Sequence, residues 1–160
     1  QKILKIMPTE NISLEDKLKE QCESTKDFES LVYYYIKNKN SQEAFKIALE
    51  KIGVGRAILV LLETKQINKA VKLAYEEFGI NRAVAIYLNH GLGPKAAQFA
   101  EKHSHLRYAL DMYINLGLRK DSTRLAAQFG VTLENGSKHK KPVKFREYDS
   151  EEQNLYIESP

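Results

Sequence analysis

The sequence has little of the material that several protein classes depend on. Its one cysteine, Cys22, excludes an internal disulfide framework and a zinc site built on cysteines. Eight glycines, four prolines and no tryptophan in 160 residues are few for an all-β or loop-rich protein, which favours helix. The longest aliphatic run, Ala57 to Leu62, is far too short to span a bilayer, so no membrane insertion is expected.

The charge is mild overall but uneven along the chain. There are 25 basic and 21 acidic residues, a formal net charge of +4, which is modest for a dedicated nucleic-acid binder. Residues 131–160 are expected to form an extended tail with a basic half followed by an acidic half. The basic residues of this tail are Lys138, Lys140, Lys141, Lys144 and Arg146. The basic half is either a disordered polar linker or a patch for nuclear localisation or nucleic acid, and the acidic half is a motif that docks on a partner or on the chain's own basic face.

Small residues recur at a spacing of 26, and this is the main internal pattern. Neighbouring apolar positions keep the same spacing without an insertion, and the pattern predicts stacked helix pairs. Three sets of positions carry it: Ala44, Ala70, Ala96 and Ser122; Ala48, Ala74, Ala100 and Ala126; Ala57, Ala83 and Ala109. Tyrosine recurs in the same register at Tyr35, Tyr87 and Tyr113, where we expect it in the core.

Turn residues punctuate this pattern where helices should begin and end. Ser13, Asn40, Asn68 and Asn81 are expected as N-caps, and Gly53, Gly79, Gly91 and Gly117 as left-handed caps at helix ends. The fold class predicted is all-α, a right-handed α-solenoid of antiparallel helix pairs with a 26-residue repeat over residues 13–130. Residues 1–12 would be an N-terminal arm or the end of a preceding helix.

One stretch carries a family resemblance, "AVAIYLNHGLGPKAAQFAEK" from Ala83 to Lys102. With its paired alanines, turn glycine and recurring tyrosine, it resembles the tetratricopeptide-like solenoids of clathrin heavy chain, vacuolar-sorting and intraflagellar-transport proteins. The resemblance implies a scaffold segment of a larger trafficking or coat-like assembly, with a role in protein transport. We expect a cytoplasmic, intracellular protein.

A search for catalytic chemistry finds no constellation that an enzyme would need. Two of the four histidines, His103 and His105, are expected to straddle a turn, and no further ligand pair lies nearby in the sequence. We therefore expect no metal, no cofactor, no small-molecule substrate and no enzymatic activity.

Basic residues at equivalent positions are the candidates for partner binding. In a stacked array they would form ladders along one face, at Lys46, Lys72 and Arg124 and at Arg56, Arg82 and Arg107. Three interpretations stay open: a solvated face, a surface for an acidic protein, or a track for a phosphate backbone. The function predicted is a non-catalytic protein–protein interaction scaffold that binds another protein or another copy of itself. The alternative is a nucleic-acid-binding helical repeat that uses the basic ladder and the basic tail.

Overall fold

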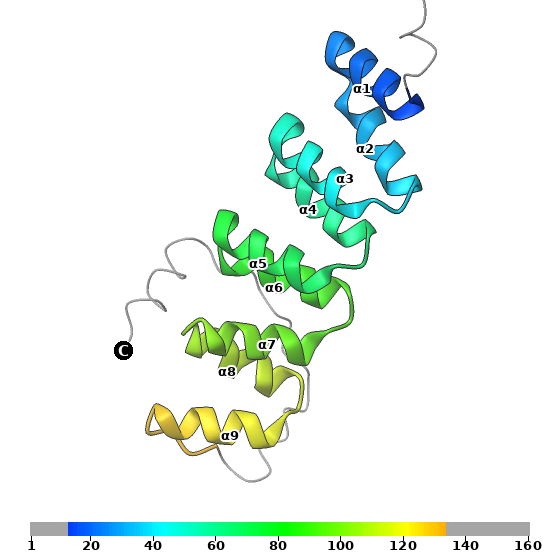
Figure 1. Ribbon diagram of the computed structural model, residues 1–160. Helices are drawn as coiled ribbons and strands as arrows, with labels where there is room; N and C mark the ends of the chain where they lie inside the picture. The colour runs from blue at the N-terminus through cyan, green and yellow to red at the C-terminus, as the bar shows by residue number, and fades with distance from the viewer. Residues whose placement is uncertain (1–12, 134–160) are drawn as a thin grey trace, which may run out of the picture. The chain divides into compact units, whose positions relative to one another are not determined.

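The described part of the chain is entirely helical. The structure is a computed structural model that describes residues 13–133 (Figure 1). Nine α-helices and no strand occur within those residues, which confirms the all-α prediction. No helix of this part of the chain combines the length and the apolar character that a membrane span requires.

The chain divides into two compact units, residues 1–66 and 67–160. The first unit contains α1 (Leu14–Thr25), α2 (Phe28–Lys37), α3 (Ser41–Ile47) with a π-helical turn after it (Ala48–Ile52), and α4 (Val54–Glu63). The second contains α5 (Ile67–Phe78), α6 (Ile80–Asn89), α7 (Gly93–Lys102), α8 (Leu106–Asn115) and α9 (Arg119–Gln128).

Polar side chains cap the first three helices of the first unit, α1 to α3. Ser13 Oγ accepts a hydrogen bond from the Asp16 amide at 3.1 Å, and Asn40 accepts one from the Glu43 amide at 3.3 Å. These bonds satisfy amides that have no partner within the helix, and they confirm two predicted N-caps. Tyr35 of α2 is buried, and its hydroxyl donates to Glu15 of α1 at 2.7 Å, which ties the first two helices together.

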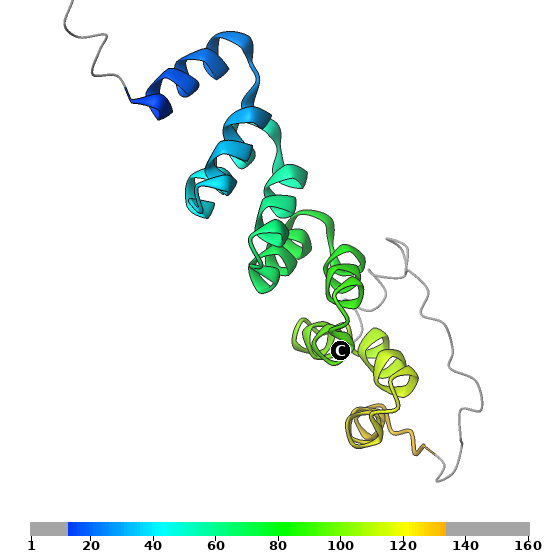
Figure 2. The same cartoon turned by 90° about the vertical axis from the view of Figure 1, so that its right-hand side faces the viewer.

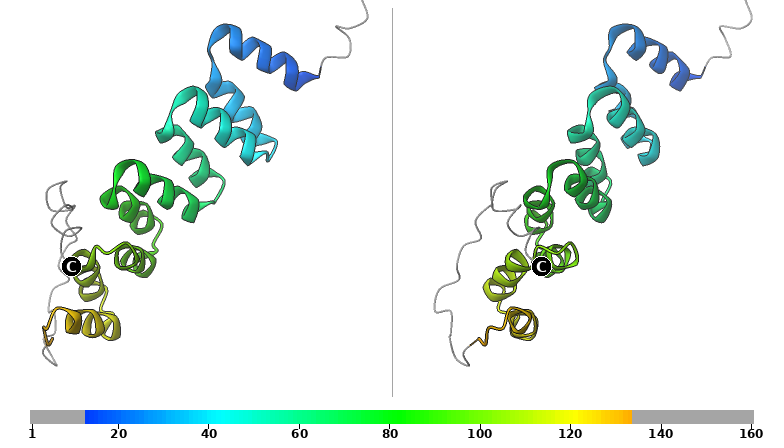
Figure 3. Two further views of the ribbon diagram at one scale, coloured as in Figure 1. Left: turned by 60° about the vertical axis from the view of Figure 1, so that its left-hand side comes forward. Right: turned by 90° about the vertical axis from the view of Figure 1, so that its left-hand side faces the viewer.

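In the second unit, each helix packs against the next one along the chain. Figures 2 and 3 turn the molecule so that the succession from α5 to α9 can be followed. Arg124 of α9 reaches Glu101 of α7 at 2.7 Å, so these two helices also lie side by side. The Tyr75 ring of α5 also lies 5.4 Å from the Phe99 ring of α7, so α5, α7 and α9 follow one another as layers (Figure 1).

The small residues that recur at 26-residue spacing lie inside both units. Every alanine of the three sets is 0% exposed, and Ser122 is 4% exposed. A side chain this small allows helix axes to approach closely, so the core depends on these positions staying small. Tyr35, Tyr87 and Tyr113 are also buried, as the pattern predicts.

Four details of the predicted caps are wrong. Gly53 and Gly79 are not left-handed caps but are extended with positive φ (φ 93°, ψ −173° at Gly79), and each begins the next helix. Only glycine adopts that region at low cost, so Gly79 can join α5 to α6 as a single residue. Asn68 and Asn81 lie inside the first turns of α5 and α6 rather than capping them.

Candidate functional site

The second unit contains a groove of about 500 Å³, which we call the lysine groove. Its walls come from three helices: α5 and α7 face each other and α6 provides the floor. Residues four apart on α5, and three, four and seven apart on α7, lie on one helix face, which is why these side chains converge. The lining residues are Asn68, Lys72, Tyr87, Lys95, Gln98, Phe99, Lys102 and His103.

The charge of the lysine groove is of one sign. Lys72, Lys95 and Lys102 are exposed at its rim, and no aspartate or glutamate is among the lining residues. Within residues 13–133, none of these three lysines lies within 4.0 Å of a carboxylate oxygen. Three ammonium groups around one concave surface raise the local positive potential and favour an anionic occupant.

Tyr87 forms the floor of the groove. It is 7% exposed, and its hydroxyl donates to Asn68 Oδ1 at 2.8 Å. Burial raises the pKa of the Tyr87 phenol, so the hydroxyl stays protonated at neutral pH. The groove therefore offers ammonium groups and neutral amide and hydroxyl dipoles, with no negative charge of its own.

Aromatic rings close one end of the groove. The His103 ring lies 4.3 Å from the Phe99 ring and 4.5 Å from the Tyr75 ring, centroid to centroid. Burial, and secondarily the charge of Lys102, lower the pKa of His103, so its ring is neutral at pH 7. An anion in the groove would oppose both effects and favour the protonated ring.

A second histidine lies behind this aromatic end. His105 is 1% exposed, and its Nε2 atom lies 3.1 Å from the hydroxyl oxygen of Tyr75, thirty residues earlier in the chain. Its Nδ1 atom is buried without a hydrogen-bond partner among the described residues. Burial lowers the pKa of His105, which keeps the core side of the groove uncharged.

The equivalent position between α7 and α9 has the opposite chemistry. Tyr113 stands 26 residues after Tyr87, and its hydroxyl donates to Glu101 at 2.9 Å. Arg124 donates to the same carboxylate at 2.8 and 2.7 Å. Hydrogen bonds from Arg124 and Tyr113 lower the pKa of Glu101, so this position has its own carboxylate at neutral pH.

Three substitutions along the 26-residue register explain the contrast between the two positions. Where the α7–α9 side has Glu101, Asp121 and Arg124, the lysine groove has Tyr75, Lys95 and Gln98. Both carboxylates are thus replaced, one by an aromatic ring and one by a lysine. The lysine groove thus has a buried tyrosine, as the other position does, but no carboxylate equivalent to that of Glu101.

The structure places the predicted contact residues in different environments. Lys72 lines the lysine groove, whereas Arg124 is engaged by Glu101 and Asp121. Arg56 pairs with Glu29 at 3.0 Å and Glu63 at 3.1 Å within the first unit.

The remaining predicted residues divide between the surface and the tail. The Arg82 guanidinium lies over the Phe78 ring at 5.1 Å, and Lys46 and Arg107 are exposed. Five predicted residues lie outside the described part of the chain: Lys138, Lys140, Lys141, Lys144 and Arg146.

Sequence reasoning missed most of the groove. Lys95 and Lys102 are seven residues apart and therefore share a face of α7, a signal that was available in the sequence. Asn68 was assigned to a cap, because nothing local shows that it accepts the Tyr87 hydroxyl from nineteen residues away.

Comparison with known proteins adds no relative. No protein-family model, no curated protein and no solved structure matches the chain. Within residues 13–133, no group of three histidine, cysteine or acidic side chains is arranged to hold a metal ion.

Proposed function

We propose that this chain is a non-catalytic interaction scaffold that binds an acidic segment of a protein partner in the lysine groove. One observation carries the proposal: three lysines converge on a concave surface that contains no carboxylate, while the equivalent position between α7 and α9 has its own. A partner's carboxylates would supply the missing charge.

The wider architecture we propose is a right-handed α-solenoid whose helix pairs follow the 26-residue repeat. The buried alanines at that spacing and the succession of packed helices support it. Each layer of a solenoid presents the same helix face to solvent. A change of a few side chains can therefore convert a layer whose charges are paired within the chain into a surface that binds a partner. The tetratricopeptide-like resemblance adds a place in a trafficking or coat-like assembly.

The rival proposal is nucleic-acid binding, which the same three lysines would also favour. Non-specific strand binding usually adds exposed aromatic rings on which bases stack. In the lysine groove Tyr87 is buried and Phe99 is half-buried, its ring packed against His103. That arrangement favours carboxylates on a flexible peptide over stacked bases.

Fluorescence anisotropy would test the proposal with the full 160-residue chain. The probes are a labelled peptide rich in aspartate and glutamate, a single-stranded oligonucleotide and a duplex, each at low and near-physiological salt. Binding of the peptide that persists at near-physiological salt supports the scaffold. Tighter binding of an oligonucleotide with a steep loss at higher salt would favour the rival.

A matched pair of variants assigns the binding to the groove. The triple variant Lys72→Gln, Lys95→Gln, Lys102→Gln should weaken peptide binding by about tenfold or more, since each charge contact contributes up to about 1 kcal/mol. The control removes three exposed charges of the same unit that do not line the groove: Lys69→Gln, Arg119→Gln and Lys120→Gln. Equal losses in both variants would contradict a specific groove.

A further inference from the structure

The acidic half of the tail matches the charge that the lysine groove lacks. From residue 147 to residue 160 the chain has five carboxylate side chains and no lysine or arginine: Glu147, Asp149, Glu151, Glu152 and Glu158. These residues lie outside the described part of the chain. We infer that this acidic segment occupies the lysine groove of its own chain and competes there with the partner's acidic segment. The inference rests on the proposed function.

The tail is long enough to reach the groove. Thirteen residues, 134–146, separate the last described residue, Leu133, from the acidic segment. Extended, they span up to about 45 Å. The groove opens between α5 and α7, and α9 lies beside α7 through the pair of Arg124 with Glu101. With helix axes about 10 Å apart, the distance to cross is about 20 Å.

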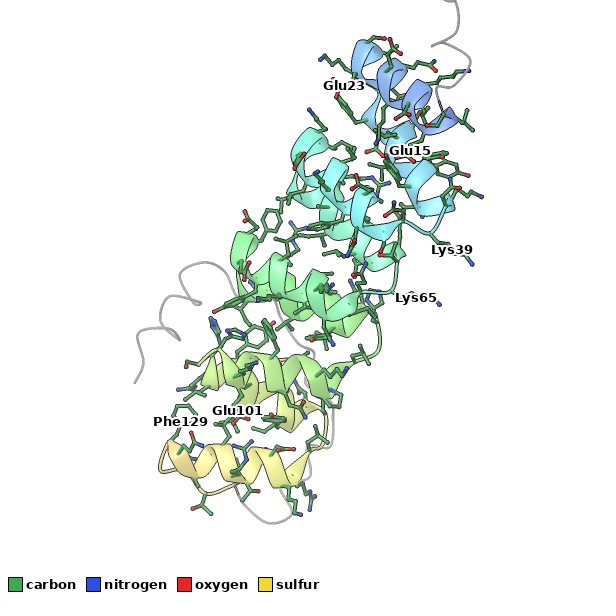
Figure 4. All side chains as sticks on the ribbon, in the orientation of Figure 1. Glu15, Glu23, Lys39, Lys65, Glu101 and Phe129 are labelled. Carbon is green, nitrogen blue, oxygen red and sulfur yellow. The ribbon has the colours of Figure 1, made fainter. Side chains whose placement is uncertain are left out.

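The last described helix, α9, ends at the same end of the second unit as α7, which is the end where Lys102 and His103 line the groove. Figure 4 labels Phe129, which follows α9, and Glu101, near the end of α7, and both lie at the same end of the second unit. Lys102 and His103 line the groove at this end. The tail therefore starts near the end of the groove where its lysine and histidine are found.

The order of charges in the tail determines which half can bind. The basic run from Lys138 to Arg146 would meet three lysines in the groove and is repelled by them. The acidic segment is attracted by the same lysines. A volume of about 500 Å³ fits a short part of that segment, such as residues 149–152, rather than all of it.

Covalent attachment makes the competition effective even when the contact is weak. A flexible connection of this length gives an effective concentration on the order of 1 mM. If the tail binds with a dissociation constant of about 100 µM, it weakens the binding of an external acidic peptide by about tenfold. Partner binding would then require a segment that is more acidic than the tail or present at high local concentration.

The experiment compares the full chain with a variant in which the tail has lost its charge. The variant is Glu147→Gln, Asp149→Asn, Glu151→Gln, Glu152→Gln, and the probe is a labelled peptide with the sequence of residues 147–158. The control loses four exposed acidic charges elsewhere: Glu20→Gln, Glu23→Gln, Glu50→Gln and Glu77→Gln. We expect the tail variant to bind the probe about tenfold more tightly than the unaltered chain and than the control.

Each outcome separates the inference from the proposed function. If the tail variant and the unaltered chain bind the probe equally well, the inference is overturned and the proposed function stands. A further variant combines the tail changes with the three lysine-to-glutamine changes in the groove. If the tail variant gains affinity for the probe and this combined variant keeps the gain, the tail acts away from the groove and the inference is also overturned. If no variant binds any acidic peptide, the proposed function fails and the inference fails with it.

Zero-length carbodiimide cross-linking provides a second readout that does not depend on a probe. We expect amide bonds between Lys72, Lys95 or Lys102 and a carboxylate of residues 147–152, within one chain. Mixing heavy- and light-isotope chains distinguishes the source of the carboxylate. Mixed heavy–light products would assign the groove to the tail of a second copy and would overturn the intramolecular contact.

Discussion

Two neighbouring layers of the second unit share a tyrosine floor and differ in where the negative charge comes from. Between α7 and α9, Tyr113 and Arg124 converge on the carboxylate of Glu101. Between α5 and α7, Tyr87 meets the neutral amide of Asn68, and three lysines have no carboxylate near them. The difference shows that an internal ion pair joins one pair of helices and is absent from the other, and under the proposed function that absence leaves room for a partner's carboxylate.

Removing the internal anion should have the largest effect on stability. Glu101→Gln takes the charge from a carboxylate that accepts from Tyr113 and Arg124, and hydrogen bonds to charged groups contribute about 1.5–3 kcal/mol. Because Arg124 is nearly half exposed, we expect a loss of about 2 kcal/mol in the free energy of unfolding by urea denaturation. The control Glu76→Gln, an exposed residue of α5, should change it by less than about 0.5 kcal/mol.

Adding a carboxylate to the lysine groove should make it resemble the position between α7 and α9, which already has one. Gln98→Glu places a carboxylate on the groove wall, three residues after Lys95 and four before Lys102. We expect affinity for an acidic peptide to fall by about tenfold, or about 1.4 kcal/mol, with little change in stability. The control is Gln128→Glu, an exposed site on α9 outside the groove. Unchanged peptide affinity in Gln98→Glu would contradict the groove as the binding site.

The buried histidine behind the groove should make stability depend on pH. The folded pKa of His105 lies below its ordinary value near 6.5, so the unfolded chain takes up the proton first. Its contribution to stability is therefore complete above about pH 6.5 and is lost as the pH falls. As the pH falls from 7 to 5.5, we expect the free energy of unfolding to fall, with a slope from this one proton of at most about 1.4 kcal/mol per pH unit.

The variant His105→Gln isolates this contribution. It should reduce the slope of the unfolding free energy against pH in that range, whatever it does to stability at pH 7, and His103, whose pKa is also lowered, contributes to the slope that remains. His103→Gln, which removes the other histidine whose pKa burial lowers, is the comparison, and a slope that changes in that variant but not in His105→Gln would contradict the assignment. The pKa of Glu101 is lowered instead, so its contribution is lost only at more acidic pH and does not overlap this window.

Removing each tyrosine hydroxyl in turn compares the two positions directly, through small losses in the free energy of unfolding. Tyr87→Phe removes a bond to an exposed asparagine, which water can replace, so we expect a loss below about 0.5 kcal/mol. Tyr113→Phe removes a donor from Glu101 and should cost about 1 kcal/mol more, since that acceptor is charged. Thermal unfolding of the two variants side by side measures the difference, and equal losses would contradict the contrast between the layers.

Local sequence signals were sufficient for the helices and their packing positions. Ser13 and Asn40 lie where an N-cap is needed, and a buried alanine recurs because close helix packing requires a small residue. These features depend on neighbours within one turn or on a regular period. A single sequence contains both kinds of information.

The charges of the candidate site depend on partners that are distant in sequence. Arg56 and Arg124 look like open contact residues until Glu29 and Glu101 are found beside them, twenty-seven and twenty-three residues away. Lys72 belongs to the groove because α7 brings Lys95 and Lys102 opposite it. Tertiary contacts determine which basic residues are paired with a carboxylate, so the basic positions could be read from the sequence but their pairing could not.

The Tyr75–His105 contact has a consequence for how the second unit opens. The hydrogen bond joins α5 to the residue that begins α8, so α5 cannot detach without also uncovering a buried imidazole. Helices α5 to α8 should therefore open as one cooperative block, and their most protected amides should exchange with solvent deuterium at similar free energies. Helix α9 is attached to α7 through the more exposed Arg124 pair and should exchange earlier, as a separate step.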